Sequence, residues 1–315
     1  MAKIGIIGAG FSGLATAWYL LNLPNPPQVT LYSQGPICSR ISAGLLHKYM
    51  GLYAKLNPLA LAAEKEAHQL LAIAQTFSET PLILSKGFIR PGCSEKQVQA
   101  YKTQASLYSD VEWLENCQSL DPNGPSLPGL YIPSGIVIDT DGYLDALLKA
   151  SLYKGLIIAD QPLESEAYDH IIQAMGASTP LIHHAVKGQL IEIKWPSIPI
   201  LPYTLIGPVY IAMTKDKKRA VIGATYEHSY KSCDPDKKFA IDFLYPKAIH
   251  LYPLLEGAEV LSVKAALRAS TPSRLPIASI LTSKNSVISG MGSRGLLYHA
   301  YFANQLVNKL MALIS

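Results

Sequence analysis

The hydrophobic pattern of the first 35 residues predicts a strand, a glycine turn and a helix. Residues 3–7 form a short apolar run, and three glycines follow it at Gly8, Gly10 and Gly13. Behind the glycines, apolar side chains recur at helical spacing, at Leu14, Ala17, Trp18 and Leu21. A second apolar run, "QVTLYS", predicts another strand at the distance expected of a strand–helix–strand unit.

The rest of the chain alternates between helical and strand-like periods. Helices are expected over residues 58–77 and 94–110, with a strand over residues 81–91 between them. Residues 129–150 read as short strands leading to a helix with Asp141 as a plausible cap. An apolar strand closes on Gly176, and residues 181–266 are mostly strand-like, with a charged hairpin tip at "TKDKKR" and one helix near residues 235–251.

The C-terminus returns to a strand, a glycine turn and a helix over residues 285–311. A second glycine-rich helix start at the far end of the chain, with a β-rich block before it, indicates interleaved domains instead of two successive halves. The sequence therefore predicts an α/β fold, α+β overall, with two interleaved domains.

Composition narrows the class of protein. The chain has 315 residues, of which 49% are hydrophobic and 16% charged, as in a soluble globular protein. No apolar run approaches the roughly 20 residues of a membrane span, and the N-terminal glycines favour a fold over an export signal. The four scattered cysteines suggest buried or incidental thiols in a reducing cytoplasm. A net charge of +4 permits an anionic partner without requiring one.

The N-terminal glycines predict dinucleotide binding. Gly8 permits the tight turn, Gly10 lets the backbone approach a pyrophosphate, and Gly13 lets the helix pack on the strand. The pyrophosphate would lie at the positive end of the helix dipole. The acid that usually bonds the ribose is replaced by Ser33, and no acidic residue precedes Glu64. This motif alone leaves FAD and NADP open.

Several longer segments resemble one family in a shared order along nearly the whole chain. They are "QVTLYS", "SRISAGLLHKYMG", "KGQL", "VYIAMTKDKKRAVIGATYEHS", "ALRASTPSRLPIAS" and "GMGSRGLLYHAYFANQL". Together they resemble the D-amino-acid oxidase/glycine oxidase family of FAD-dependent enzymes. Within it, the chain is most similar to the oxidase half of a bifunctional enzyme that makes 5-methylaminomethyl-2-thiouridine in tRNA. That enzyme's second strand also lacks the acid, so the resemblance implies FAD.

The resemblance also implies a domain division. A Rossmann-like FAD-binding domain would comprise residues 1–80, 135–180 and 266–315. A substrate domain with a mixed, largely antiparallel sheet would comprise residues 81–134 and 181–265. Two departures stand out: residues 154–173 look trimmed, and "KGQL" resembles an Arg-Gly-Gln turn with Lys187 in place of arginine. The methyltransferase half of the bifunctional enzyme has no counterpart here.

The resemblance implies three residues for substrate binding. Arg268 matches the family's carboxylate-binding arginine, whose planar guanidinium grips a carboxylate through two parallel hydrogen bonds. Tyr210 matches a pocket tyrosine of glycine oxidase, and Tyr226 a second lining position across the same hairpin. Both tyrosines are expected on strands.

The implied flavin contacts come from five parts of the chain. At the C-terminal loop, Gly290, Gly292 and Gly295 would let backbone N–H groups approach the flavin, with the following helix adding its positive end. His47 lies in the loop expected beside the ring. The adjacent His183 and His184 lack a third ligand, so no metal is expected. The full set of cofactor candidates is Gly8, Gly10, Phe11, Ser12, Gly13, Ser33, Arg40, Ala43, Gly44, Leu45, Gly176, Gly290, Gly292, Ser293, Arg294, Gly295 and Leu296.

The implied function is an FAD-dependent oxidoreductase that cleaves the C–N bond of an N-substituted glycine. In the tRNA version, carboxymethylaminomethyl-uridine loses glyoxylate. The close alternative is a small-molecule oxidase or dehydrogenase of glycine, sarcosine or a D-amino acid. An alternative of another class is a protein that binds FAD or tRNA without turnover. The "KDKKR" tip is compatible with tRNA phosphates or with a solvated turn. The electron acceptor, the flavin attachment and the oligomeric state stay open.

Overall fold

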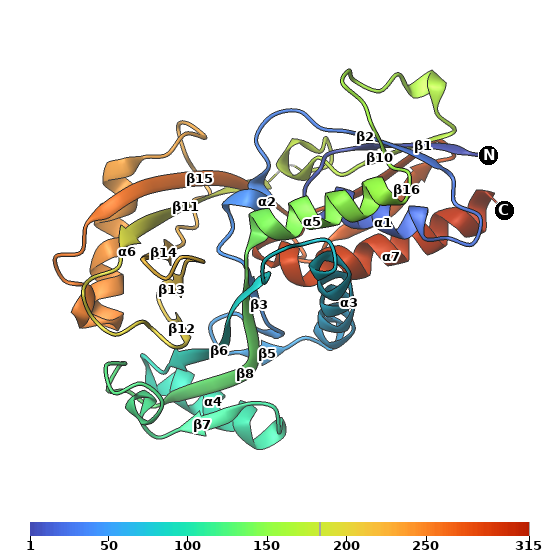
Figure 1. The fold of residues 1–315 in the computed structure, drawn as a ribbon. Coiled ribbons are helices and arrows are strands. Elements are labelled where there is room, and N and C mark those ends of the chain that lie inside the picture. Colours follow the sequence, from blue (N-terminus) through green and yellow to red (C-terminus); the bar gives the residue numbers. More distant parts are fainter. Residues whose placement is uncertain (183, 315) are drawn as a thin grey trace.

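The computed structural model describes residues 1–182 and 184–314 and contains the expected N-terminal unit. β1 (Lys3–Ile7) leads through the glycines to α1 (Phe11–Leu21), and β2 (Gln28–Tyr32) returns parallel to β1. Both lie in a six-stranded sheet with the order β16-β17-β10-β1-β2-β9 (Figure 1). The other strands are β9 (Ile157–Ile158), β10 (His170–Gln173), β16 (Ile277–Thr282) and β17 (Asn285–Ser289). All pairings are parallel except β16 with β17.

The trimmed stretch forms the outer edge of this sheet. β9 has only two residues, and it pairs with Thr30 and Leu31 of β2. The shortening expected of residues 154–173 is therefore seen as an edge strand of only two residues.

The second sheet has nine strands in the order β15-β11-β14-β13-β12-β6-β8-β3, with β7 on β8. All neighbours are antiparallel except β12 with β6. Its strands are β3 (Leu45–Leu46), β6 (Ile83–Pro91), β7 (Glu112–Leu114), β8 (Gly129–Ile138), β11 (His184–Lys194), β12 (Thr204–Ile206), β13 (Tyr210–Met213), β14 (Arg219–Gly223) and β15 (Val260–Ser270). A small hairpin, β4 (Tyr49–Met50) with β5 (Lys55–Leu56), stands apart.

Two strands run across the positions where the domains are expected to divide. β8 is one continuous strand over residue 135, where several short strands were predicted, and β15 is continuous over residue 266. Figure 1 shows β15 running from the sheet near α6 (Lys237–Leu251) toward α2 (Cys38–Ile41), beside the other sheet. The domain boundaries stay a prediction, since long strands connect the two parts without a linker at these points.

Helices cover one side of the six-stranded sheet. α1, α3 (Pro58–Gln75), α5 (Thr140–Tyr153) and α7 (Gly295–Ile314) pack together in one apolar core (Figure 1). A second core lies under α6, and a third near α4 (Glu95–Leu107). Asp139, not Asp141, caps α5, because its carboxylate accepts the Gly142 N–H at 3.1 Å. Asp141 lies two residues further on, inside the first turn of the helix.

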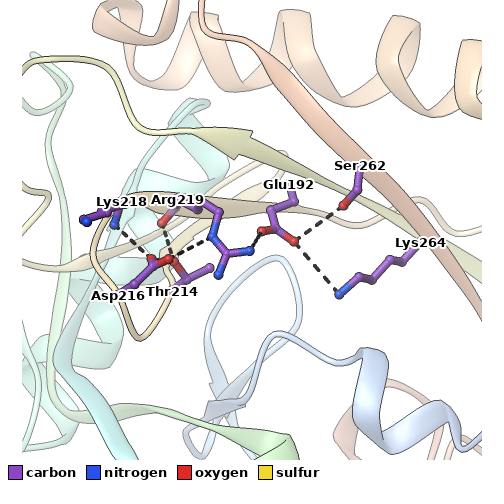
Figure 2. A network of polar contacts seen from close by, with 7 residues as sticks. All are labelled: Glu192, Thr214, Asp216, Lys218, Arg219, Ser262 and Lys264. Atoms are coloured by element: carbon purple, nitrogen blue, oxygen red, sulfur yellow. Dashed lines mark hydrogen bonds and ion pairs between the residues drawn. The ribbon is translucent and has the colours of Figure 1, made fainter.

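The charged hairpin tip between β13 and β14 is used inside the molecule. Lys215 donates to the Asp139 carboxylate at 3.1 Å, and Lys217 donates to the Leu84 carbonyl at 2.7 Å. Arg219 bonds Asp216 at 3.0 Å and also the largely buried Glu192 of β11 (Figure 2). Lys215 and Arg219 are therefore paired with acids of the chain and Lys217 with a carbonyl, while Lys218 lies exposed at the tip.

Two simpler expectations concern cysteines and membranes. Over residues 1–182 and 184–314 all four cysteines are free thiols, and Cys117 is buried while the other three are exposed. In the same part of the chain, no helix combines the length and the apolar character needed to cross a bilayer.

A buried histidine ties α1, α5 and α7 together. The His299 ring lies 5.3 Å from the Phe11 ring, and its Nδ1 faces the Leu296 carbonyl at 2.9 Å. A carbonyl only accepts, so Nδ1 carries the proton, and Nε2 accepts from the Tyr143 hydroxyl at 2.7 Å. Burial lowers the pKa of His299 to about 4.

We expect this histidine to make stability depend on pH. In the unfolded chain His299 has a pKa of about 6.5, and in the folded protein its pKa is about 4. As the pH falls from 6.5 to 4, the unfolded chain therefore binds a proton that the folded protein does not bind, and the free energy of unfolding decreases. From pH 7 to pH 5 the loss is about 2 kcal/mol from this group alone. Urea unfolding at both pH values measures it. The double variant Tyr143→Phe with His299→Phe should lose that part of the dependence, and an unchanged dependence would contradict the assignment.

Candidate flavin and carboxylate site

The N-terminal glycine loop closes so tightly that two of its positions admit only glycine. Gly8 has φ +113°, and a Cβ there would lie 2.4 Å from the Ala174 carbonyl oxygen. A Cβ on Gly13 would lie 1.8 Å from the Gly8 carbonyl oxygen. The turn and the helix packing predicted for these glycines are therefore built into the backbone.

Two serine hydroxyls accept hydrogen bonds from backbone N–H groups of this loop. The Ala9 N–H donates to Ser33 Oγ and the Phe11 N–H to Ser39 Oγ, both at 3.2 Å. Ser33 thus lies at the loop, in the place where a carboxylate was expected. Ser39 was missed by the sequence reading; its position in the "SRISAGLL" segment was the available signal.

The C-terminal glycine loop lies beside the N-terminal one. A Cβ on Gly295, the first residue of α7, would lie 3.4 Å from the Phe11 ring at the start of α1. The Ser289 hydroxyl donates to the Gly176 carbonyl at 2.9 Å, which joins the ends of β10 and β17. Candidates separated by nearly 290 residues thus gather at the carboxyl edge of one parallel sheet, where such folds bind nucleotides.

His47 supplies an unsatisfied polar atom in this region. Its Nδ1 is buried and has no hydrogen-bond partner among the described residues, and its ring meets Phe88 edge-on at 5.3 Å. Burial, with smaller effects from Arg90 and Arg294, lowers the pKa of His47 to about 3. The ring is therefore neutral at pH 7. Arg294 also faces a cleft of about 420 Å³ whose other walls are residues 50–53 and 55–57.

These features fit a flavin dinucleotide. The glycine cradles leave backbone exposed at two helix starts, and neither first turn contains an acidic residue. Gly44 belongs to the same pattern, because its φ is +74° and a Cβ would lie 1.9 Å from the Ile138 carbonyl oxygen. The other candidates lie on the same loops and helix starts: Gly10, Ser12, Ala43, Leu45, Gly290, Gly292, Ser293 and Leu296. Their contacts with FAD stay predictions.

Arg40 does not join this group. Its guanidinium turns to α5, where it pairs with Asp141 at 3.1 Å and Asp145 at 2.6 Å. The geometry gives Arg40 a role in holding α2 against α5, and its predicted role at the cofactor has no support from these contacts.

Arg268 lies on β15, opposite Val186 of β11. Its guanidinium donates to the Thr225 carbonyl at 3.0 Å and lies 5.6 Å from the centre of the Tyr226 ring. Below it is Gly188, where a Cβ would lie 2.3 Å from the guanidinium carbon. The cation is thus held between a glycine backbone and an aromatic ring.

The two tyrosines take different positions around Arg268. Tyr210 begins β13, and its hydroxyl lies against Gly223, where a Cβ would come within 2.3 Å of the oxygen. Burial raises the pKa of Tyr210 to about 12 against an opposing effect of Arg268, so the phenol is neutral. Tyr226 was expected on a strand, which is wrong: it lies in the loop after β14 and is 52% exposed.

The short helix α2 connects the two parts of the site. It packs against β15, and its Ser39 bonds the start of α1. Cys38, also on α2, has an exposed side chain whose thiol lies near other atoms: this partial desolvation raises the Cys38 pKa, and the charge of Arg268 opposes the rise. The carboxylate candidates and the glycine loop therefore lie on two sides of α2.

Two further expectations concern β11 and the residues just before it. "KGQL" was expected as a turn, which is wrong, because Lys187 to Leu190 lie in the middle of β11, paired with β15. His183 lies outside the described residues. Within residues 1–182 and 184–314, no group of three or more His, Cys, Asp or Glu side chains is arranged to hold a metal.

Comparisons with known proteins agree on one family. The profile of the DAO family, described as FAD dependent oxidoreductase, matches residues 3–308. The tRNA 5-methylaminomethyl-2-thiouridine biosynthesis bifunctional protein of Polaromonas sp. is 32% identical over 151 residues, which is 43% of this chain and 24% of that relative. The chain thus spans well under half of that protein.

Solved structures share the fold. Glycine oxidase from Geobacillus kaustophilus has a TM-score of 0.83 at 20% identity, covering 99% of this chain and 95% of that one. Iminodiacetate oxidase from Chelativorans sp. BNC1 has a TM-score of 0.80 at 18% identity, covering 98% and 95%. L-α-glycerophosphate oxidase from Mycoplasma pneumoniae, solved with FAD bound, has a TM-score of 0.80 at 17% identity, covering 99% and 95%.

We expect Gly8→Ala to remove bound flavin, because the new methyl group would collide with Ala174 and force the loop open. The visible absorbance of bound flavin per chain measures this. Gly155→Ala is the matched control: Gly155 also has a positive φ, +94°, but has open space around it and lies at the end of α5. Equal flavin loss in both variants would mean that backbone strain alone, and not the cradle, is responsible.

Proposed function

This chain belongs to the DAO family of FAD-dependent oxidoreductases, and from that premise we propose that it oxidises the C–N bond of an N-substituted glycine. The proposed substrate is the carboxymethylaminomethyl group of a tRNA uridine. The observation that carries the proposal is the placement of Arg268 against Gly188 and over the Tyr226 ring, on a strand that contacts both α2 and residues 292–294 of the C-terminal glycine loop.

Arg268 supplies what an N-substituted glycine needs from the protein. A guanidinium has five N–H donors, so its bond to the Thr225 carbonyl leaves donors for a carboxylate. That carbonyl also restricts rotation of the guanidinium about its long side chain. A carboxylate bound there in bidentate fashion would have a fixed orientation, with its neighbouring CH2 group directed along a defined line.

Tyr210 supplies a neutral donor to the same ligand. Because its pKa is about 12, the phenol keeps its proton at pH 7 and can donate a hydrogen bond to an oxygen of the same carboxylate. Neutral His47, with its unpartnered Nδ1, adds a polar atom without adding charge. The described charge nearest the bound acid group would then be Arg268.

FAD, held by the glycine loops at Gly8 to Gly13 and Gly290 to Gly295, would supply the two-electron oxidant for the carbon beside the carboxylate. The substrate R–NH–CH2–COO⁻ loses two electrons and two protons to give the imine R–N=CH–COO⁻. Water then adds to the imine and releases R–NH2 and glyoxylate. An amine that arrives unprotonated needs no strong base, so the protein's task is to bind, orient and enclose the acid group.

Two observations bear on the choice of substrate. The 32% identical relative is named for tRNA modification, and the ring over Arg268 is 52% exposed, which suits a glycine group presented at the end of a large molecule. The fold is also that of oxidases named for glycine and iminodiacetate, and iminodiacetate is itself an N-substituted glycine. Free N-substituted glycines are therefore the second candidate.

We expect Arg268→Met to lower kcat/KM for N-substituted glycines by roughly two orders of magnitude, because a desolvated charge pair of this kind contributes about 2–5 kcal/mol. Arg268→Lys should restore only part of the loss, since an ammonium cannot bind a carboxylate in bidentate fashion. Steady-state kinetics measure both. Arg274→Met, at an exposed arginine in the next loop, is the control and should match the parent enzyme. Undiminished turnover in Arg268→Met would overturn the proposal.

Anaerobic reduction of the bound flavin separates the two substrates. We expect bleaching by tRNA that carries carboxymethylaminomethyl-uridine, with glyoxylate and aminomethyl-uridine as the products. Undermodified tRNA should leave the flavin oxidised. Rapid bleaching by glycine or sarcosine, with none by the modified tRNA, would support the small-molecule candidate instead.

A further inference from the structure

We propose that Lys187, Gly188 and Gln189 of β11 are the positioning element of the carboxylate site. The guanidinium of Arg268 lies against the backbone of Gly188. Lys187 and Gln189 hold the loop of residues 225–236 over that guanidinium. This inference rests on the proposed function, because it assumes that Arg268 binds the substrate carboxylate.

Gly188 determines how closely the guanidinium approaches the sheet. A Cβ at this position would lie 2.3 Å from both Cζ and Nη2 of Arg268 and 2.5 Å from Nη1. The planar group therefore lies directly on the Gly188 backbone. Any side chain there would lift the guanidinium or turn it away, and atoms at these distances overlap heavily.

Lys187 holds the far part of the loop. It is only 3% exposed, and its ammonium donates to the Ser232 carbonyl at 2.9 Å and to the Asp234 carbonyl at 2.6 Å. Its backbone also exchanges two hydrogen bonds with Glu227, at 3.0 and 2.9 Å. A buried cation held by backbone carbonyls organises a loop that contains no helix or strand of its own.

Gln189 holds both ends of the same loop. Its backbone N–H donates to the Thr225 hydroxyl at 2.8 Å, and its carbonyl accepts the Thr225 N–H at 3.0 Å. Its side-chain oxygen accepts the Asp236 N–H at 2.7 Å, and its side-chain nitrogen donates to Glu227 at 3.0 Å. Gln189 is fully buried, so these bonds are protected from water.

The loop in turn fixes Arg268. Thr225, held by Gln189, presents the carbonyl that accepts from the guanidinium, and Tyr226 follows with the ring beside it. Three consecutive residues of one strand thus define the floor under the cation and the loop above it. This explains how a lysine serves in a position where the resemblance implied arginine: its ammonium satisfies two carbonyls and does not itself meet the substrate.

The test measures carboxylate binding and turnover in the flavin-loaded protein. We expect Lys187→Met and Gly188→Ala to raise the Kd of acetate, followed by the change in flavin absorbance, about 10- to 100-fold. KM for the N-substituted glycine should rise in parallel, while flavin occupancy and the rate of reduction by dithionite stay unchanged. Lys187→Arg should recover most of the binding, since an arginine can also reach two carbonyls.

Lys194→Met, at an exposed lysine on the same strand, is the matched control and should leave the Kd unchanged. If Lys187→Met does not fold, Gly188→Ala decides, because it leaves the loop bonds intact. Normal acetate binding in both variants, with binding lost in Arg268→Met, would overturn this inference and leave the proposed function standing. Normal binding and turnover in Arg268→Met would overturn the proposed function as well.

Discussion

The contact of the Arg268 guanidinium with the backbone of Gly188 is the interaction on which the candidate site depends. It is a contact between a cation and a residue without a side chain, and it is possible only because a Cβ is missing there. The cofactor side of the site follows the same rule, since Gly8 and Gly13 let the backbone close upon itself. In both halves of the site, glycines thus let other groups lie directly against the backbone. Their geometry is set by regular strands and helices, which hold positions better than loops do.

The charges around the candidate site leave Arg268 available to an acid group. Two ionisable groups near the site are kept neutral: burial lowers the pKa of His47 and raises that of Tyr210. The buried Lys187 ammonium donates to two carbonyls, and Lys215 of the hairpin tip pairs with Asp139. Figure 2 shows Arg219 of the same tip paired with Asp216 and Glu192. Arg268 keeps donors that are not committed to its one backbone partner. Among the described residues, the guanidinium of Arg268 has a hydrogen bond to a carbonyl and no ion pair with an acid. A carboxylate that enters this region can therefore pair with it.

β8 and β15, both strands of the nine-stranded sheet, run without a break over residues 135 and 266, and the ion pair of Lys215 with Asp139 joins this sheet to the start of α5. Lys215 and Lys217 extend from the β13–β14 hairpin to Asp139 and Leu84, next to the start of α5. On the other side, α2 packs against β15 and bonds the first turn of α1. These contacts hold the carboxylate candidates at a constant distance from the glycine loops. A reaction that transfers hydride between two separately bound molecules needs this constancy.

The family resemblance implied Arg268. The sequence by itself determined the local features: the strand–glycine–helix unit at Gly8 to Gly13, the second glycine start near Gly295, and most helix positions. These follow from chain neighbours, through periodicity and the steric freedom of glycine. Only the tertiary structure decided that "KGQL" is mid-strand, that Tyr226 lies in a loop, that Asp139 caps α5, and that Lys215 pairs with Asp139. Each of these depends on residues distant in the chain; β11 meets β15 about 80 residues later, as the register of Val186 with Arg268 shows. No local pattern records such pairings, because strand register and ion pairing are fixed by what the fold brings alongside.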